Sequence, residues 1–119
     1  MLQKLSLDGV EISTVNKSIL MKELKNIANR IRQERTEVKD IILFGSFSRE
    51  DFTPSSDIDI AIIIDKSEKK FIARFDDFID YFLNLPFDIN LIAYTTGEVD
   101  KMVKEKNTFI SEVLKGKRL

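Results

Sequence analysis

Hydrophobic side chains recur at helical spacing in three parts of the chain. The first set predicts an amphipathic helix, with Ser13 or Thr14 as its candidate N-cap: Leu20, Leu24, Ile27, Ala28 and Ile31. A second stripe follows Ser67 and ends before Pro86: Phe71, Ile72, Phe75, Phe78, Ile79, Phe82 and Leu83. A third set predicts a final helical region that stops at Gly116: Val99, Met102, Val103, Phe109, Ile110, Val113 and Leu114.

Three apolar runs instead predict buried strands, which cover residues 38–44, 58–64 and 87–94. The run 58–64 is nearly continuous in isoleucine, which is typical of a strand covered on both faces. Since no repeat or Pro/Gly-rich linker interrupts the pattern, we expect a single domain over residues 1–119. Its predicted order is helix, strand, strand, helix, strand, helix, and its fold class is α+β.

The composition excludes several kinds of chemistry. The 119 residues include no Cys and no His, which excludes disulfides, thiolate and imidazole catalysis, and metal sites built on Cys or His. The formal net charge of −1 gives the chain no overall attraction to nucleic acid or to an anionic membrane. The apolar runs are far shorter than a membrane span and a signal-peptide core is absent, so we expect a cytoplasmic protein.

Two acidic residues mark the start of the second predicted strand. Asp57 and Asp59 are two positions apart, so their side chains leave the same face of the strand. Two carboxylates about 4 Å apart repel each other by roughly 4 kcal/mol at an effective dielectric constant of about 20. The pair therefore indicates a compensating cation, and Mg²⁺ or Mn²⁺ suits paired carboxylates. For either residue alone, capping of the strand start is the simpler interpretation.

A third carboxylate, Asp88, interrupts the third apolar run. Asp is disfavoured within strands and is rarely buried without a partner. If the second and third strands are neighbours, Asp88 joins Asp57 and Asp59 in a three-carboxylate site, the arrangement used in two-metal phosphoryl or nucleotidyl transfer. An ion pair with a Lys or Arg of a neighbouring element is the alternative for Asp88 alone.

The turn after the first predicted strand has the features of an anion site. Gly45 allows close backbone approach, Ser46 offers a hydroxyl donor, and Arg49 follows one helical turn later as a phosphate clamp. The patterns G-x-x-x-x-G-K-[ST] and G-x-G-x-x-G are both absent, so neither a P-loop nor a dinucleotide-binding fold is supported. A Gly-Ser turn alone is most often only a turn, and a lone Arg is most often a solvated charge.

Two motifs together resemble the signature of the minimal nucleotidyltransferase (MNT) branch of the DNA polymerase β-like superfamily: Gly45-Ser46-x-x-Arg49 and Ser56-Asp57-Ile58-Asp59. The likeness extends over nearly the whole chain, because a helix precedes the motifs and Asp88 lies on the next predicted strand. It implies a two-layer, polymerase β palm-like fold, with helices packed on a small mixed sheet of three or four strands.

The resemblance also implies an activity and a role for each residue. A nucleoside monophosphate, in the main hypothesis AMP from ATP, is transferred to a hydroxyl acceptor with the help of Mg²⁺ or Mn²⁺. The residues that the resemblance assigns to catalysis and to the two metal ions are Asp57, Asp59 and Asp88. Those that it assigns to nucleotide binding are Gly45, Ser46, Arg49 and Ser56. Glu50 departs from the pattern, in which Gly commonly follows the Arg.

Short members of this family typically pair with an all-helical HEPN protein. In such toxin–antitoxin systems the MNT member neutralises a ribonuclease toxin, in some cases by adenylylating a tyrosine. The resemblance therefore implies an antitoxin with a HEPN-type partner, without membrane or direct nucleic-acid binding, and either a homo- or a hetero-oligomer is compatible with it. The alternative is a binding module that neutralises its partner by stoichiometric contact, with a weak or vestigial nucleotide site.

Overall fold

The computed structural model describes residues 2–7, 10–15, 17–49 and 57–119, so Glu50 and Ser56 lie outside the described residues. The strands are β1 (Leu2–Leu7), β2 (Val10–Val15), β3 (Val38–Phe44), β4 (Ile58–Ile64), β5 (Ile89–Thr95) and β6 (Lys117–Arg118). The α-helices are α1 (Lys17–Glu34), α2 (Ser46–Arg49), α3 (Phe75–Phe78), α4 (Thr96–Lys104) and α5 (Thr108–Leu114). Two 3₁₀ turns flank α3, namely η1 (Phe71–Arg74) and η2 (Ile79–Phe82). None of the helices in these ranges is long and apolar enough to cross a membrane.

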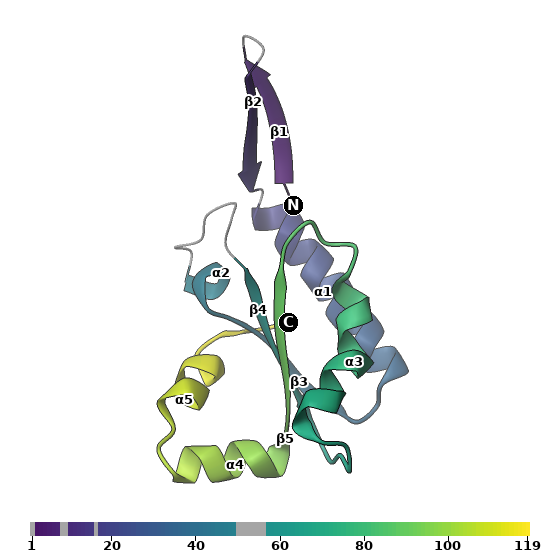
Figure 1. The fold of residues 1–119 in the computed structure, drawn as a ribbon, viewed down its shortest axis with the longest axis vertical. Coiled ribbons are helices and arrows are strands. Elements are labelled where there is room, and N and C mark those ends of the chain that lie inside the picture. Colours follow the sequence, from purple (N-terminus) through teal and green to yellow (C-terminus); the bar gives the residue numbers. More distant parts are fainter. Residues whose placement is uncertain (1, 8–9, 16, 50–56) are drawn as a thin grey trace.

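Four strands form one mixed sheet in the order β5–β4–β3–β6 (Figure 1). Strand β4 runs parallel to β5, whereas β3 runs antiparallel to both β4 and β6. Strands β1 and β2 form a separate antiparallel pair. The mixed four-stranded sheet with its packed helices confirms the predicted α+β class.

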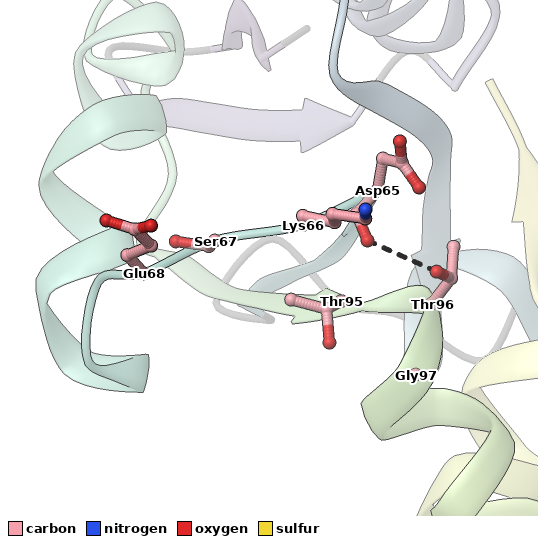
Figure 2. Close-up of a pocket in the computed structure, with 7 residues that line it drawn as sticks. All are labelled: Asp65, Lys66, Ser67, Glu68, Thr95, Thr96 and Gly97. Atoms are coloured by element: carbon pink, nitrogen blue, oxygen red, sulfur yellow. Dashed lines mark hydrogen bonds between the residues drawn. The ribbon is translucent and has the colours of Figure 1, made fainter.

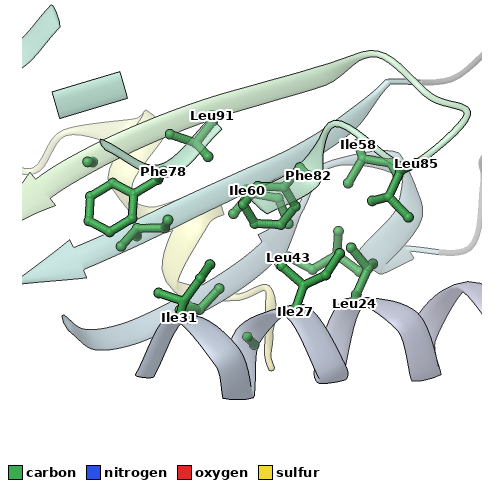
Figure 3. Close-up of a cluster of buried hydrophobic side chains, with 14 of the residues drawn as sticks. Leu24, Ile27, Ile31, Leu43, Ile58, Ile60, Phe78, Phe82, Leu85 and Leu91 are labelled. Carbon is green, nitrogen blue, oxygen red and sulfur yellow. The ribbon is translucent and has the colours of Figure 1, made fainter. Parts of the chain in front are cut away.

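Each face of the sheet has its own hydrophobic core. The larger core packs α1, α3 and η2 against the sheet, and Ile58 and Ile60 point into it (Figure 3). The smaller core packs α5 and part of α4 on the opposite face, where Ala61 and Ile63 lie. Fully burying one isoleucine side chain contributes roughly 1.5–3 kcal/mol to stability. Successive side chains of β4 point alternately into the two cores. This confirms the prediction, made from the apolar run, that both faces of this strand are covered.

The first helix begins later than the sequence pattern predicts. Ser13 and Thr14 belong to β2, where they pair with Lys4 and Gln3 of β1, so neither caps the helix, which begins at Lys17. The N-cap prediction was therefore wrong. Both residues are in extended backbone because a β-hairpin precedes the helix, and the pattern of apolar positions did not predict that hairpin.

The second helical stripe forms two 3₁₀ turns and one short α-helix instead of a continuous helix. Phe78 and Phe82 are buried in the larger core, whereas the side chain of Ile72 is 84% exposed. The third strand begins at Ile89 and not at Phe87, so Asp88 immediately precedes β5. This shift places Asp88 at the edge of the sheet, where its carboxylate is exposed to solvent.

Candidate functional site

The acid pair lies where β4 begins. Asp57 directly precedes β4 and is exposed, and Asp59 is the second residue of the strand and is half-buried. Ile58 and Ile60 are fully buried in the larger core, which fixes this part of the strand. Because strand side chains alternate, both carboxylates lie on the opposite face from these isoleucines, as the spacing predicts.

An asparagine connects the two carboxylates. The Asn90 Nδ2 group donates hydrogen bonds to Oδ2 of Asp57 at 3.1 Å and to Oδ1 of Asp59 at 3.0 Å. The parallel register places Asn90 directly beside Asp59. Hydrogen bonds to charged acceptors are stronger than neutral ones, so the amide offsets part of the repulsion within the pair.

The sequence interpretation did not include Asn90 among the site residues. The sequence could have indicated Asn90, because Asn is rare in strands. Asn90 is also two positions after Asp88, so in an extended segment both side chains point to the same face.

Gly45 lies against the carboxylate of Asp59. Its φ of +71° is in the left-handed region, and a Cβ at this position would be 2.0 Å from Oδ2 of Asp59. Phe44, the preceding residue, is the ladder partner of Asp59. The position therefore requires glycine for two reasons, its backbone conformation and its contact with the acid pair.

The turn continues into α2, which contains the other predicted phosphate contacts. Ser46 is its first residue and Arg49 its last, while the Ser48 amide and hydroxyl donate to the Gly45 carbonyl at 3.1 and 2.9 Å. The structure thus brings Gly45 to Asp59 of the acid pair, and Ser46 is the next residue in the sequence. Ser56 lies outside the described residues, and the assignment of this group to nucleotide binding stays a prediction.

The third predicted carboxylate lies next to the pair without joining it. The Asp88 carbonyl accepts a hydrogen bond from the Ile58 amide at 2.9 Å, which holds the start of β5 against the start of β4. Within the described ranges, no three acidic, His or Cys side chains lie close enough together to hold a metal ion. The amide of Asn90, and not a third carboxylate, contacts both acids, and it adds no negative charge to the site.

A separate concave region lies at the opposite end of β4 and β5 (Figure 2). The cavity has a volume of about 640 Å³. Its lining residues are Asp65, Lys66, Ser67, Glu68, Thr95, Thr96 and Gly97. The Thr96 hydroxyl donates to the Asp65 carbonyl at 3.2 Å, which joins the first residue of α4, directly after β5, to the loop that follows β4. None of the predicted site residues lines this cavity.

A mixed sheet with an acid pair beside a glycine turn is compatible with an enzyme that transfers phosphate-containing groups. The profile of the nucleotidyltransferase domain family matches residues 22–118. A protein of Methanocaldococcus jannaschii that is assigned as a protein adenylyltransferase is 33% identical over 86 residues, which cover 71% of this chain and 79% of that protein. The chain therefore belongs to the nucleotidyltransferase domain family and is a nucleotidyltransferase.

Solved structures show the same fold. A protein of Sulfolobus solfataricus assigned as a nucleotidyltransferase aligns with a TM-score of 0.59 and 22% identity, over 71% of this chain and 75% of that one. A toxin–antitoxin structure with AMP-PNP aligns with a TM-score of 0.53 and 24% identity, over 87% and 72% of the two chains. A mutant of the toxin–antitoxin complex MntA–HpeT aligns with a TM-score of 0.50 and 24% identity, over 88% and 72%. The nucleotidyltransferase fold implied by the family resemblance, a small mixed sheet with packed helices, is thus confirmed, although the helices cover both faces of the sheet and not one.

Proposed function

We propose that this nucleotidyltransferase transfers AMP from ATP to a hydroxyl group of a partner protein, in a Mg²⁺-dependent reaction. The observation that carries the proposal is the acid pair of Asp57 and Asp59, joined by Asn90 and backed by Gly45. The relative assigned as a protein adenylyltransferase supports the reaction, and the neighbour solved with AMP-PNP supports the adenine nucleotide.

The residues present fit a hard divalent cation. Asp57 and Asp59 supply carboxylate oxygens on one face of β4, and Asp88 precedes the adjacent end of β5. The two acids accept hydrogen bonds from one amide group, so their oxygens already point toward a common donor. Oxygen ligands of this kind suit Mg²⁺, which Asp57 and Asp59 would hold. When bound, Mg²⁺ would neutralise phosphate charge and polarise the phosphorus–oxygen bonds.

The chain's own residues position the reactants. Gly45 brings the backbone of the turn next to the acid pair, and Ser46 follows it as the first residue of α2, so in this proposal its hydroxyl and amide bind the terminal phosphates. The acceptor oxygen attacks the α-phosphorus, the bond from this phosphorus to the bridging oxygen of the β-phosphate breaks, and pyrophosphate leaves. Asp88, which is exposed, takes the proton of the acceptor hydroxyl as general base.

The proposed acceptor is a hydroxyl on a HEPN-type helical toxin, and the modification neutralises that toxin. Two structural neighbours are toxin–antitoxin complexes, which supports a protein partner. The reaction would take place in the cytoplasm, where ATP is available.

Labelled ATP tests this proposal directly. The chain is incubated with Mg²⁺, labelled ATP and the purified partner, and label is expected on the partner with release of pyrophosphate. The matched control is Asp65→Asn at the opposite end of β4, which should keep the activity, while Asp59→Asn should lose it. Unlabelled partner in the presence of wild-type protein, with an active adenylyltransferase as positive control, would contradict the proposal.

Stoichiometric neutralisation is the second candidate. It is favoured by the position of Asp88, which within the described residues does not join the acid pair in a three-ligand group. A triple variant with Asp57, Asp59 and Asp88 replaced by Ala distinguishes the two functions. Neutralisation of the partner by this variant would refute a catalytic requirement, and loss of neutralisation in a folded variant would support catalysis.

A further inference from the structure

An aromatic side chain lies beside the acid pair on the same face of the sheet. Phe44 ends β3 and is the ladder partner of Asp59, while Asn90 flanks Asp59 on the other side. Phe44 packs against the smaller core, which also contains Ala61, the next residue of β4 on the face of Asp59. The row across the sheet is therefore an amide, a carboxylate and an aromatic ring.

A second ring extends this row toward solvent. Phe109 is the second residue of α5, and its ring contacts the Phe44 ring edge to face, with centroids 5.8 Å apart and planes at 86°. The start of α5 is fixed, because the Asn107 side chain accepts the Ile110 amide at 3.0 Å and Ile110 itself is fully buried. The side chain of Phe109 is nevertheless 45% exposed.

Most exposed apolar side chains need no functional explanation. Phe109 differs in its location, because the ring that supports it directly precedes Gly45 in the sequence and pairs with Asp59. A nucleotide with its phosphates at Gly45 and Ser46 has its base at the far side of the sugar, and this base has a flat, apolar face. Stacking between a base and an aromatic side chain tolerates any base and strengthens binding substantially.

We propose that Phe109, supported by Phe44, stacks against the base of the nucleoside triphosphate bound at the acid pair. The inference rests on the proposed function, since it assigns the base end of the same substrate. Phe109 is a binding residue in this account, so it affects affinity for nucleotides and leaves affinity for a bare polyphosphate unchanged.

The test compares ATP with inorganic tripolyphosphate, both as Mg²⁺ complexes, by calorimetric titration. Phe109→Ala is expected to raise the Kd of ATP about tenfold and to leave the Kd of tripolyphosphate unchanged. Phe109→Leu retains an apolar contact with Phe44 without a π-face, and it should weaken ATP binding similarly. Phe71→Ala is the matched control, because Phe71 is 41% exposed and also contacts an aromatic ring, that of Tyr94, at 5.2 Å.

A fluorescent variant provides an independent measurement. The chain contains no Trp, so Phe109→Trp creates a single tryptophan at the proposed stacking position. We expect ATP to quench its emission and tripolyphosphate to leave it unchanged. Equal loss of affinity for both ligands in Phe109→Ala, or no loss for ATP, would overturn the stacking proposal. Failure of the wild-type protein to bind either ligand would overturn the proposed function itself.

Discussion

The two ends of the parallel strands β4 and β5 differ in what their polar side chains do. At the amino end, Asp57 and Asp59 lie on one face and share a single amide donor, Asn90. At the carboxyl end a cavity of about 640 Å³ lies between the loop after β4 and the junction of β5 with α4, where Thr95 and Glu98 form a reciprocal capping box. The acid pair and this cavity are thus at opposite ends of the same two strands.

At the carboxyl end of the two strands, the polar groups form hydrogen bonds and ion pairs with one another. Arg74 is 6% exposed, and it forms an ion pair with Glu98 at 2.5 Å and donates to the Ala93 carbonyl at 3.1 Å. Burial alone raises the pKa of Glu98, but hydrogen bonds from Arg74 and Thr95 outweigh it, so this pKa lies below its ordinary value. Paired and capped groups of this kind contribute to stability, whereas adjacent like charges oppose it. This difference is consistent with the proposed placement of the catalytic site at the amino end.

The largest expected effect follows from removing charge at the amino end. Asp59→Asn should lower nucleotidyl transfer about 1000-fold, because it removes a carboxylate that would hold the cation and orient the phosphates. The fold should remain intact, since the substitution relieves repulsion with Asp57. Rates of label transfer and thermal unfolding check both expectations. Asp65→Asn at the carboxyl end is the control, and equal losses in the two variants would contradict a functional difference between the ends.

Two glycines provide the next comparison. Gly45→Ala should lower activity by about 10- to 100-fold and cost about 1–3 kcal/mol of stability, because φ is +71° and the new Cβ would clash with Asp59. Gly97→Ala at the carboxyl end should stabilise the protein by about 0.5–1 kcal/mol and leave activity unchanged, since the nearest atom to its Cβ is 4.0 Å away. Urea unfolding and transfer rates measure both variants. Similar effects of the two substitutions would refute the close contact at Gly45.

An ion pair at the carboxyl end of the strands should also account for part of the loss of folding stability at low pH. Because the pKa of Glu98 is lowered in the folded state, its contribution to stability is present above the unfolded pKa near 4.5 and is lost as the pH falls through the folded pKa. Glu98→Gln retains a side chain suited to the capping box and removes the charge. The difference in free energy of unfolding between wild type and this variant should therefore shrink below pH 4.5. A difference that stays constant from pH 6 to pH 3 would show that the ion pair with Arg74 has no such role.

The smallest effect concerns the C-terminal end of α4. Lys106 has φ of +57°, and its amide and that of Asn107 donate to the carbonyls of Val103 and Met102, which is the Schellman arrangement usually closed by glycine. Lys106→Gly should stabilise the protein by about 1 kcal/mol by relieving this conformation. Activity should not change, because Lys106 is not one of the residues assigned to the site. Unfolding free energies and transfer rates test the variant, and destabilisation would contradict the backbone argument.

The sequence predicts the helices and strands whose apolar side chains are buried at regular spacing. It does not predict the features that depend on which strands pair with one another. The isoleucine run of β4 and the position of its two acids follow from periodicity alone. The β1–β2 hairpin was missed although Asp8-Gly9, between the alternating segments Leu5-Ser6-Leu7 and Val10-Glu11-Ile12, is a strong hairpin signal. The contact of Asn90 with both acids depends on the parallel register of β4 and β5, which one sequence does not specify. The start of β5 after Asp88 depends on the same register.

Paramagnetic broadening by Mn²⁺ tests most directly where the chemistry is located. Mn²⁺ is titrated into isotopically labelled protein with and without ATP, and amide signals are followed at both ends of the strand pair. We predict selective broadening at Gly45, Asp59 and Asn90, with the signals of Thr95, Thr96 and Gly97 retained, and loss of the selective effect in Asp59→Asn. Broadening centred on Thr95, Thr96 and Gly97, or none at Asp59, would contradict the assignment of the active site to the acid pair.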